Sequence, residues 1–525
     1  MSHGKSIGSE RTAEQKVNTK NSIKRVFLAG FSIILELALF MLIAVEFAAY
    51  AQWIAIVTRI MAAMLVLGLT SRNESASVKI PWIILIMALP VMGVTLYLLI
   101  GLNGATKKMK RRYELIDEYL FPILDSKETK VDTGETDYPP APNLMDYLKT
   151  HAGYPVWDNT QITYYSEASD AFEAQLKDLA KAEKFIFMEY HAIEEAEAFD
   201  RLLAILERKV KEGVEVRLFY DDMGSVGFIN FSFIHRMEEK GIACKVFNPV
   251  VPGLNFFLNN RDHRKITVID GKVGFTGGYN LANEYFNITH PYGYWKDTGI
   301  RLEGEAVSSM TVTFLEMWNA AGKTMPDMGE AEKYFLSEPY QKETNCLVQP
   351  YADSPMDKER VGENVYAKIA TGATRYAYFV TPYLILSDEM IFLMGLAAKS
   401  GVDVRIITPG IPDKKLIYSV TRSYYYSLIR NGVRIYEYTP GFSHAKMSVA
   451  DDCIATCGSI NLDYRSLYHH FENGCVIYGG ETPAKIREDI ERMFEESEEV
   501  TGKYADRSRR MRLSQLILRL FAPLL

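Results

Sequence analysis

Three strongly apolar runs lie near the N-terminus of the sequence, before any α/β pattern begins. Val26–Val45 contains one charged residue, Trp53–Leu69 also contains one, and Ile80–Leu102 contains none. About 20 apolar residues are enough to cross a bilayer as a helix. The pattern therefore predicts a transmembrane region over 26–102 with two or three spans. A cleaved signal peptide is disfavoured, because more apolar sequence follows the first run at once.

The segments that flank this region carry most of the topological information. Residues 1–25 are polar and contain several basic residues, and 103–160 is predicted to be a basic juxtamembrane linker that opens with Lys107, Lys108, Lys110, Arg111 and Arg112. The positive-inside tendency places both flanks in the cytoplasm and requires an even number of crossings. An ion pair between Glu36 and Arg59 would instead favour three crossings. The dense basic cluster favours the cytoplasmic alternative.

From about residue 160 onward, short β-rich runs alternate with helix-like stretches, which is typical of an α/β fold. The sequence also repeats itself, since Gly213–Leu218 matches Gly401–Ile406 and each leads into a histidine motif. We predict two pseudo-symmetric α/β/α repeats, 161–345 and 346–500, preceded by N-terminal transmembrane helices. The amphipathic segment 501–525 is expected either to lie on the membrane or to dock on the core.

Composition excludes several kinds of site. The formal charge is −7 and the isoelectric point is near 5.9, which opposes a nucleic-acid partner. The five cysteines form no CxxC pair, and Cys453 and Cys457 lack further ligands at zinc spacing. Neither a disulfide framework nor a metal site is expected.

The chemistry is concentrated in a doubled motif with the pattern HxKx4Dx6G(G/S)xN. Its first copy contains His263, Lys265, Asp270, Gly278 and Asn280, and its second contains His444, Lys446, Asp451, Ser459 and Asn461. A single HxK is weak support for function. Two copies with the same offsets are strong support.

The spacing explains the residue types. Side chains at i and i+2 of a strand share one face, so each histidine points with its lysine. Such a pair is reasonable when both address one anion, because lysine neutralises phosphate and histidine attacks or protonates. Asn280 and Asn461 can add amide donors. Asp270 and Asp451 follow the strands and are expected to brace the site.

An acid follows each motif. A catalytic imidazole needs a partner on its second nitrogen to fix the tautomer. We expect Asp297 to orient His263 and Glu472 to orient His444, each within its own repeat.

At these residues the sequence resembles the phospholipase D superfamily, and within it the bacterial cardiolipin synthases. Further similar segments include Arg217–Asp222, Thr381–Tyr383 and Asn461–Ser466. The resemblance covers roughly residues 80–525. Gly278 departs from the pattern, since Ser459 stands at that point of the second copy.

The resemblance implies that two phosphatidylglycerol molecules become cardiolipin and glycerol at a bacterial cell membrane. It implies His263 as nucleophile and His444 as acid and base. Lys265, Lys446 and the two asparagines would hold the phosphoryl oxygens. No metal or other cofactor is implied. The alternatives are a hydrolytic phospholipase D, a nuclease of the same superfamily and an inactive membrane scaffold.

Overall fold

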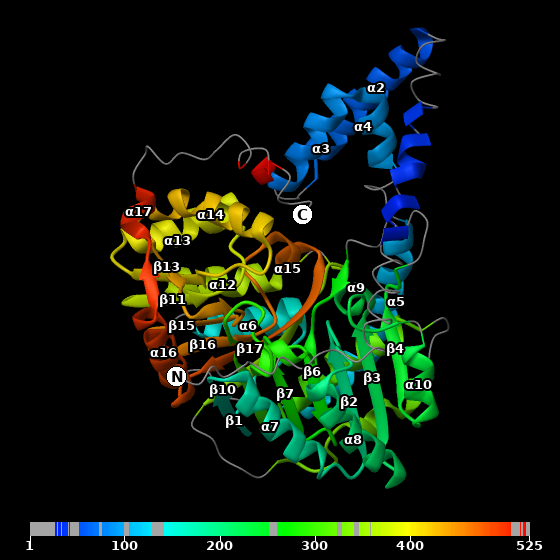
Figure 1. Ribbon diagram of the computed structural model, residues 1–525, viewed down its shortest axis with the longest axis vertical. Coiled ribbons are helices and arrows are strands. Elements are labelled where there is room, and N and C mark those ends of the chain that lie inside the picture. The colour runs from blue at the N-terminus through cyan, green and yellow to red at the C-terminus, as the bar shows by residue number, and fades with distance from the viewer. Residues whose placement is uncertain are drawn as a thin grey trace, which may run out of the picture.

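The computed structural model describes residues 27–28, 30–32, 34–39, 41–42, 52–72, 76–98, 104–128, 141–230, 232–250, 260–322, 328–340, 346–357, 359–505, 515 and 518–520. Two β-sheets with helices on their faces form the body of the protein (Figure 1). Their strand orders are β1-β9-β7-β6-β2-β3-β4 and β10-β17-β16-β15-β11-β12-β13-β18. The two orders correspond strand for strand apart from the added β18, which confirms the predicted α/β duplication.

The first sheet and its helices occupy the first repeat. Its strands are β1 (Thr160–Tyr165), β2 (Phe185–Tyr190), β3 (Glu215–Asp221), β4 (Ala243–Phe247), β6 (Lys265–Ile269), β7 (Val273–Gly277) and β9 (Gly299–Gly304), with the short β5 (Arg261–Asp262) and β8 (Tyr294–Lys296) outside it. Its helices are α7 (Ala168–Leu179), α8 (Glu197–Lys211), α9 (Asp222–Ser225), α10 (Phe233–Glu239), η3 (Asn283–Phe286), α11 (Val307–Ala320) and η4 (Met328–Tyr334).

The second repeat is built in the same way. Its strands are β10 (Leu347–Asp353), β11 (Tyr376–Val380), β12 (Asp403–Pro409), β13 (Arg434–Tyr438), β14 (Gly441–Ser443), β15 (Met447–Ala450), β16 (Ile454–Gly458), β17 (His470–Tyr478) and β18 (Ser497–Glu499). Its helices are α12 (Val361–Gly372), α13 (Asp388–Lys399), α14 (Lys415–Ile429), α15 (Tyr464–Tyr468), α16 (Thr482–Glu495) and α17 (Thr501–Ala505).

The two sheets meet along their central strands. β16 of the second repeat contacts β7 and β9 of the first. A hydrogen bond from the Asn473 side chain to Thr276 Oγ1 crosses this junction at 2.7 Å. Apolar residues of both repeats join one large buried cluster. The histidine motifs therefore start from strands that belong to one continuous core.

Residues 103–160 are more than the linker that the sequence suggests. They contain helix α5 (Gly104–Lys127) and helix α6 (Ala141–Ala152). Helix α5 packs against α11 and buries Tyr113, Ile116 and Leu120 in the main core. The basic residues at its start obscure this role, because the buried positions come only afterwards.

The N-terminal helices lie apart from the two sheets (Figure 1). They are α2 (Gln52–Thr70), α3 (Ala76–Ala88) and α4 (Pro90–Leu96), and the described residues of 27–42 are also helical. The third apolar run is not one continuous helix, since Leu89 leaves helical geometry and Pro90 opens α4. Gly93 allows α4 to lie directly against the backbone of Ile86 in α3.

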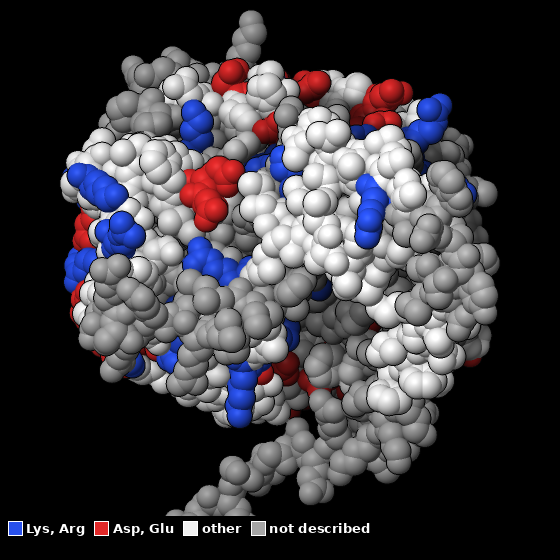
Figure 2. All heavy atoms as spheres, turned by 90° about the horizontal axis from the view of Figure 1, so that it is seen from above, with Lys and Arg blue, Asp and Glu red and all other residues white. Residues whose placement is uncertain are grey.

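Within the part of the chain that the structure describes, no helix is both long and apolar enough to cross a membrane. The predicted ion pair between Glu36 and Arg59 is also absent from the described ion pairs, and Glu36 instead accepts a hydrogen bond from Ser32 at 3.2 Å. Seen from above, a wide area of the surface carries few charged side chains (Figure 2). Helices α2–α4 expose large apolar residues such as Ile60, Met64 and Leu67.

The described residues of the C-terminal segment dock on the second repeat. The Arg519 guanidinium lies 4.3 Å from the centre of the Tyr424 ring, and Gln515 donates to the Ser419 carbonyl at 3.3 Å. Both partners belong to helix α14. This contact favours the docking alternative for 501–525.

Candidate active site

Both motif histidines face one cavity of about 580 Å³. His263 lies between β5 and β6, and His444 lies between β14 and β15, at corresponding places of the two repeats. Each is more than nine-tenths buried. The duplicated sequence thus produces a single site at the junction of the repeats.

The histidines are oriented by acids from the opposite repeat, so the predicted pairing within each repeat is wrong. His263 Nδ1 lies 2.9 Å from both carboxylate oxygens of Glu472. His444 Nδ1 lies 2.7 Å from Asp297 Oδ2. Both acids are fully buried. Each acid thus contacts Nδ1 of its histidine and does not contact Nε2.

Short parallel strand pairs explain this exchange. β5 pairs with β17, and the His263 amide donates to the Phe471 carbonyl at 2.9 Å. β14 pairs with β8, and the His444 amide donates to the Lys296 carbonyl at 2.7 Å. The backbone amide of each histidine is therefore hydrogen-bonded to the residue immediately before the acid of the other repeat. This places each histidine next to that acid.

The difference between Gly278 and Ser459 follows from the same geometry. The Ser459 hydroxyl donates to Glu472 Oε2, so it helps to hold the acid that orients His263. A Cβ at Gly278 would lie 2.0 Å from Asp297 Oδ1. The first repeat needs glycine because the acid itself fills this space.

The two lysines lie beside the histidines as the spacing predicts. Lys265 Nζ donates to the His263 carbonyl at 2.6 Å, and Lys446 Nζ lies 2.7 Å from His444 Nδ1 and 3.0 Å from His444 Nε2. Both are almost fully buried. Burial lowers the pKa of Lys265 to about 8 and that of Lys446 to about 7. When the two lysines are protonated, their charges are shielded from bulk solvent and would therefore attract a bound anion strongly.

Burial also shifts the pKa values of the two histidines and of one acid. Burial, followed by the charges of Lys265 and Lys446, lowers the pKa of both His263 and His444 well below its ordinary value. Burial raises the pKa of Asp297 to about 7. At neutral pH both imidazoles are therefore uncharged, as a nitrogen nucleophile requires.

Asp270 and Asp451 do not contact the histidines. The Asp270 carboxylate accepts hydrogen bonds from the backbone amides of Glu183, Lys184 and Phe185 at 2.7–2.8 Å. The Asp451 carboxylate accepts three equivalent bonds from Thr374, Arg375 and Tyr376. Both acids thus fix the start of a central strand, β2 or β11, which agrees with a bracing role and not with direct chemistry.

The two asparagines line the cavity, but they are held differently. Asn280 accepts from the Ala192 amide and donates to the Tyr285 hydroxyl at 2.8 Å. Asn461 donates to Asp463 Oδ2 at 3.1 Å. Its carbonyl oxygen has no hydrogen-bond partner among the described residues. Both amide groups therefore need to reorient before they can bind phosphate oxygens.

Sequence reasoning missed several cavity residues. His191 follows β2, and its ring centre is 4.9 Å from that of His263. His470 opens β17, and its ring centre is 5.4 Å from the same ring. Around His444 the neighbours are instead aromatic: Tyr285, Trp295 and Phe442. His470 could have been suspected, because it stands two residues before Glu472.

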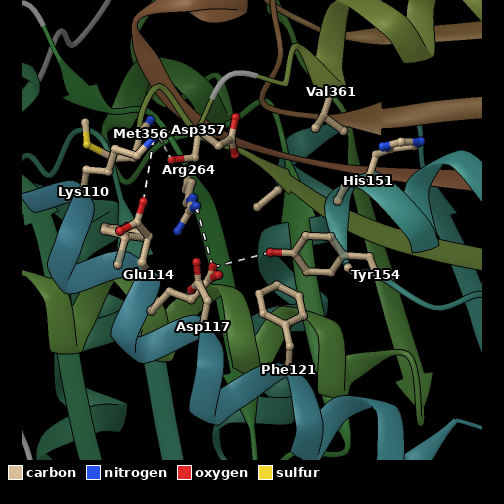
Figure 3. A pocket seen from close by; sticks show the side chains of 16 residues that line it. Lys110, Glu114, Asp117, Phe121, His151, Tyr154, Arg264, Met356, Asp357 and Val361 are labelled. Carbon is tan, nitrogen blue, oxygen red and sulfur yellow. Dashed lines mark hydrogen bonds and ion pairs between the residues drawn. The ribbon is translucent and has the colours of Figure 1, made fainter.

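A second cavity of about 310 Å³ is lined by Arg264, the residue that follows His263 (Figure 3). Arg264 extends into it from between the two motif residues, as alternation along a strand requires. Its guanidinium is fully buried, donates to the Thr313 carbonyl, and lies 3.9 Å from Glu189 and 4.0 Å from Glu316. Arg264 therefore anchors the loop that carries His263.

Arg264→Met is expected to destabilise the protein by about 3–5 kcal/mol, because it leaves buried acids without their cation. Lys110→Met is the matched control at the rim of the same cavity. Its 3.8 Å pair with Glu114 is exposed and is worth at most about 1 kcal/mol. Thermal unfolding of both variants in the same detergent measures the difference. Equal midpoints would show that Arg264 does not anchor the loop.

The lysine pKa values predict how an anion binds. Sulfate does not titrate near neutral pH, so its affinity reports the site alone. Binding favours protonated lysines, and the affinity should fall as pH rises from 7 to 9, by up to about tenfold per unit for each lysine. Lys446→Met should remove the step near pH 7 and leave the step near pH 8. Calorimetric titration at four pH values checks this, and a flat profile would contradict it.

Comparison with known proteins places this site in a family. The family described as "Cardiolipin synthase, PLD-like domain" matches residues 176–318 and 366–494, and "Phospholipase D-nuclease N-terminal" matches 54–101. An uncharacterised protein of Streptococcus mutans is 41% identical over 87% of this chain and 98% of its own length. Cardiolipin synthase 2 of Bacillus cereus is 32% identical over 86% of this chain and 88% of its own length.

A solved structure supports the fold. The phosphatidylserine synthase of Haemophilus influenzae superposes with a TM-score of 0.55 and 15% sequence identity. The match covers 73% of this chain and 97% of that one.

Proposed function

Because this chain belongs to the cardiolipin synthase family of the phospholipase D superfamily, we propose that it transfers a phosphatidyl group between two phosphatidylglycerol molecules. The products are cardiolipin and glycerol. One observation carries the proposal: two buried His/Lys pairs address one cavity, and an acid holds Nδ1 of each histidine.

The first step is attack by His263 Nε2 on the phosphorus of one phosphatidylglycerol. A P–N bond forms, and the bond from phosphorus to the headgroup glycerol oxygen breaks. His444 donates its Nε2 proton to that oxygen, because an unprotonated alkoxide is a poor leaving group. The substrate anion offsets the lysine charges and so raises the pKa of His444 toward the acidic role.

The second step reverses the first with a new alcohol. His444 Nε2 takes the proton from the glycerol hydroxyl of the second phosphatidylglycerol, and the oxygen attacks phosphorus. The P–N bond breaks, and His263 returns to its starting state. Lys265 and Lys446 stabilise the negative charge on the phosphoryl oxygens in both steps. One phosphodiester replaces another, so no ATP is required.

Aromatic walls favour an alcohol over water as acceptor. Tyr285, Tyr292, Trp295 and Tyr383 line the cavity and reduce its hydration. Purified enzyme supplied with headgroup-labelled phosphatidylglycerol is expected to release labelled glycerol and to form cardiolipin. Phosphatidic acid as the sole lipid product would replace this function with hydrolysis.

We also propose that the enzyme acts at the bacterial cell membrane, with two or three spans in 26–102 and the catalytic repeats in the cytoplasm. The exposed apolar residues of α2–α4 support membrane association. A cysteine introduced at the exposed Glu118 of α5 tests the orientation. An impermeant thiol reagent should label it only after the cells are opened. Labelling in intact cells would place the repeats outside.

A further inference from the structure

The two half-sites differ beside their histidines, although their motifs match. β17 pairs His470 with Arg261 and Phe471 with Asp262, immediately before His263. β8 pairs Trp295 with Phe442 and Lys296 with Ser443, immediately before His444. By this register, His470 corresponds to Trp295. One half-site thus has a third potential ligand where the other has an indole.

His470 has no assigned task in phosphatidyl transfer. Its side chain is nine-tenths buried, and neither ring nitrogen has a hydrogen-bond partner among the described residues. Buried polar groups without partners cost free energy and call for an explanation. Its Nδ1 lies 3.5 Å from Glu472 Oε1, the carboxylate that also holds His263.

We propose that His263, His470 and Glu472 form a binding site for a divalent transition-metal ion such as Zn²⁺, and that occupation of this site switches the enzyme off. The three residues each offer one ligand atom, and these atoms lie within 4.8 Å of one another. Two imidazoles and a carboxylate are a donor set that zinc accepts. The inhibitory consequence rests on the proposed function, whereas the binding site does not.

The spacing suits a small ion. Ligand atoms at about 2.0–2.1 Å from a tetrahedral zinc ion lie about 3.4 Å apart. The Glu472 carboxylate is 2.9 Å from His263 Nδ1 and 3.5 Å from His470 Nδ1. The three candidate ligand atoms lie within 4.8 Å of one another, so the side chains must close slightly around one ion.

Metal binding and nucleophilic attack exclude each other through the tautomer of His263. In the metal-free site Nδ1 carries the proton and donates it to Glu472, which leaves the Nε2 lone pair for attack. A metal ion at Nδ1 would bind through the lone pair of Nδ1, and the single ring proton must then move to Nε2. The ring stays neutral, but the attacking atom has lost its lone pair. The ion therefore acts without blocking the cavity.

Cation binding by the full-length protein in detergent tests the site without any substrate. Co²⁺ serves as a spectroscopic probe, and Zn²⁺ is titrated by calorimetry. We expect one ion per chain, with affinity weakened by at least about 10–100-fold in His470→Asn, as for changes around other metal sites. His470→Cys keeps a ligand and should retain binding. His235→Asn is the control, since His235 and Glu239 form an exposed pair at 3.2 Å.

Activity supplies the second arm. Zn²⁺ should inhibit cardiolipin formation reversibly, and a chelator should restore it. Inhibition, expressed relative to each variant's own rate, should weaken in His470→Asn in parallel with binding. Mg²⁺ should have no such effect, because it prefers oxygen ligands.

The outcomes separate the claims. Equal Zn²⁺ binding in the parent and His470→Asn would overturn the site, whatever reaction the enzyme catalyses. Binding that depends on His470 but leaves the rate unchanged would overturn the switch. Hydrolysis in place of transfer, with intact His470-dependent binding, would refute only the proposed function.

Discussion

His263→Ala is expected to abolish both cardiolipin synthesis and the covalent phosphatidyl-enzyme, because the variant lacks the nitrogen that forms the P–N bond. His444→Ala should form the adduct about 10²–10⁴-fold more slowly, since the leaving glycerol loses its acid. The His444→Ala protein should also accumulate the adduct under conditions in which breakdown of the adduct is slowed more than its formation. Acid-quenched mass spectrometry with phosphatidylglycerol distinguishes the two.

The same experiment can reverse the assignment. A phosphatidyl adduct on His444 in the His263→Ala protein would make His444 the nucleophile. Absence of an adduct in the parent and every variant would argue for direct transfer between the two lipids. Asp270→Asn is a control for folding defects, because among the described residues that carboxylate accepts hydrogen bonds only from the backbone amides at the start of β2.

Glu472→Gln is expected to slow adduct formation by up to about 10⁴-fold, although Glu472 lies in the opposite repeat from His263. An amide can stabilise the wrong tautomer of the imidazole, and the corresponding change in a serine-protease triad costs about that much. Asp297→Asn should instead affect the steps in which His444 moves protons. Rapid-quench kinetics of adduct formation and decay measure the two variants separately.

The crossed geometry makes this comparison decisive. If each acid served the histidine of its own repeat, Asp297→Asn would slow attack and Glu472→Gln would impair the acid. The distances of 2.9 Å and 2.7 Å predict the opposite assignment. Ser459→Ala should give a milder defect of the same kind as Glu472→Gln, because its hydroxyl only supports that carboxylate.

The sequence was sufficient for the parts of the site that depend on local spacing. His263 with Lys265, and His444 with Lys446, follow from the two-residue period of a strand. The repeat predicted two similar sheets, and their strand orders agree. These features depend on residues close together in the sequence or on a repeated segment, so they can be predicted from one sequence.

The acid partners could not be assigned in this way. Both acids were identified, but their partners depend on β5 pairing with β17 and β14 with β8, which sequence spacing does not encode. The role of α5 was missed for a related reason. Its buried residues pack on α11, about 200 positions later, and a basic first turn dominates its composition. Pro90 was the overlooked local signal, since it divides the third apolar run.

The crossed pairing also sets the moment at which a newly made chain becomes active. His263 is complete early in synthesis, but Glu472 follows it by 209 residues. A ribosome at about 5–20 residues per second needs roughly 10–40 s to cover that interval. During this time His263 has been made but has no orienting acid. The nucleophile therefore gains its orienting acid only when the second repeat has been made.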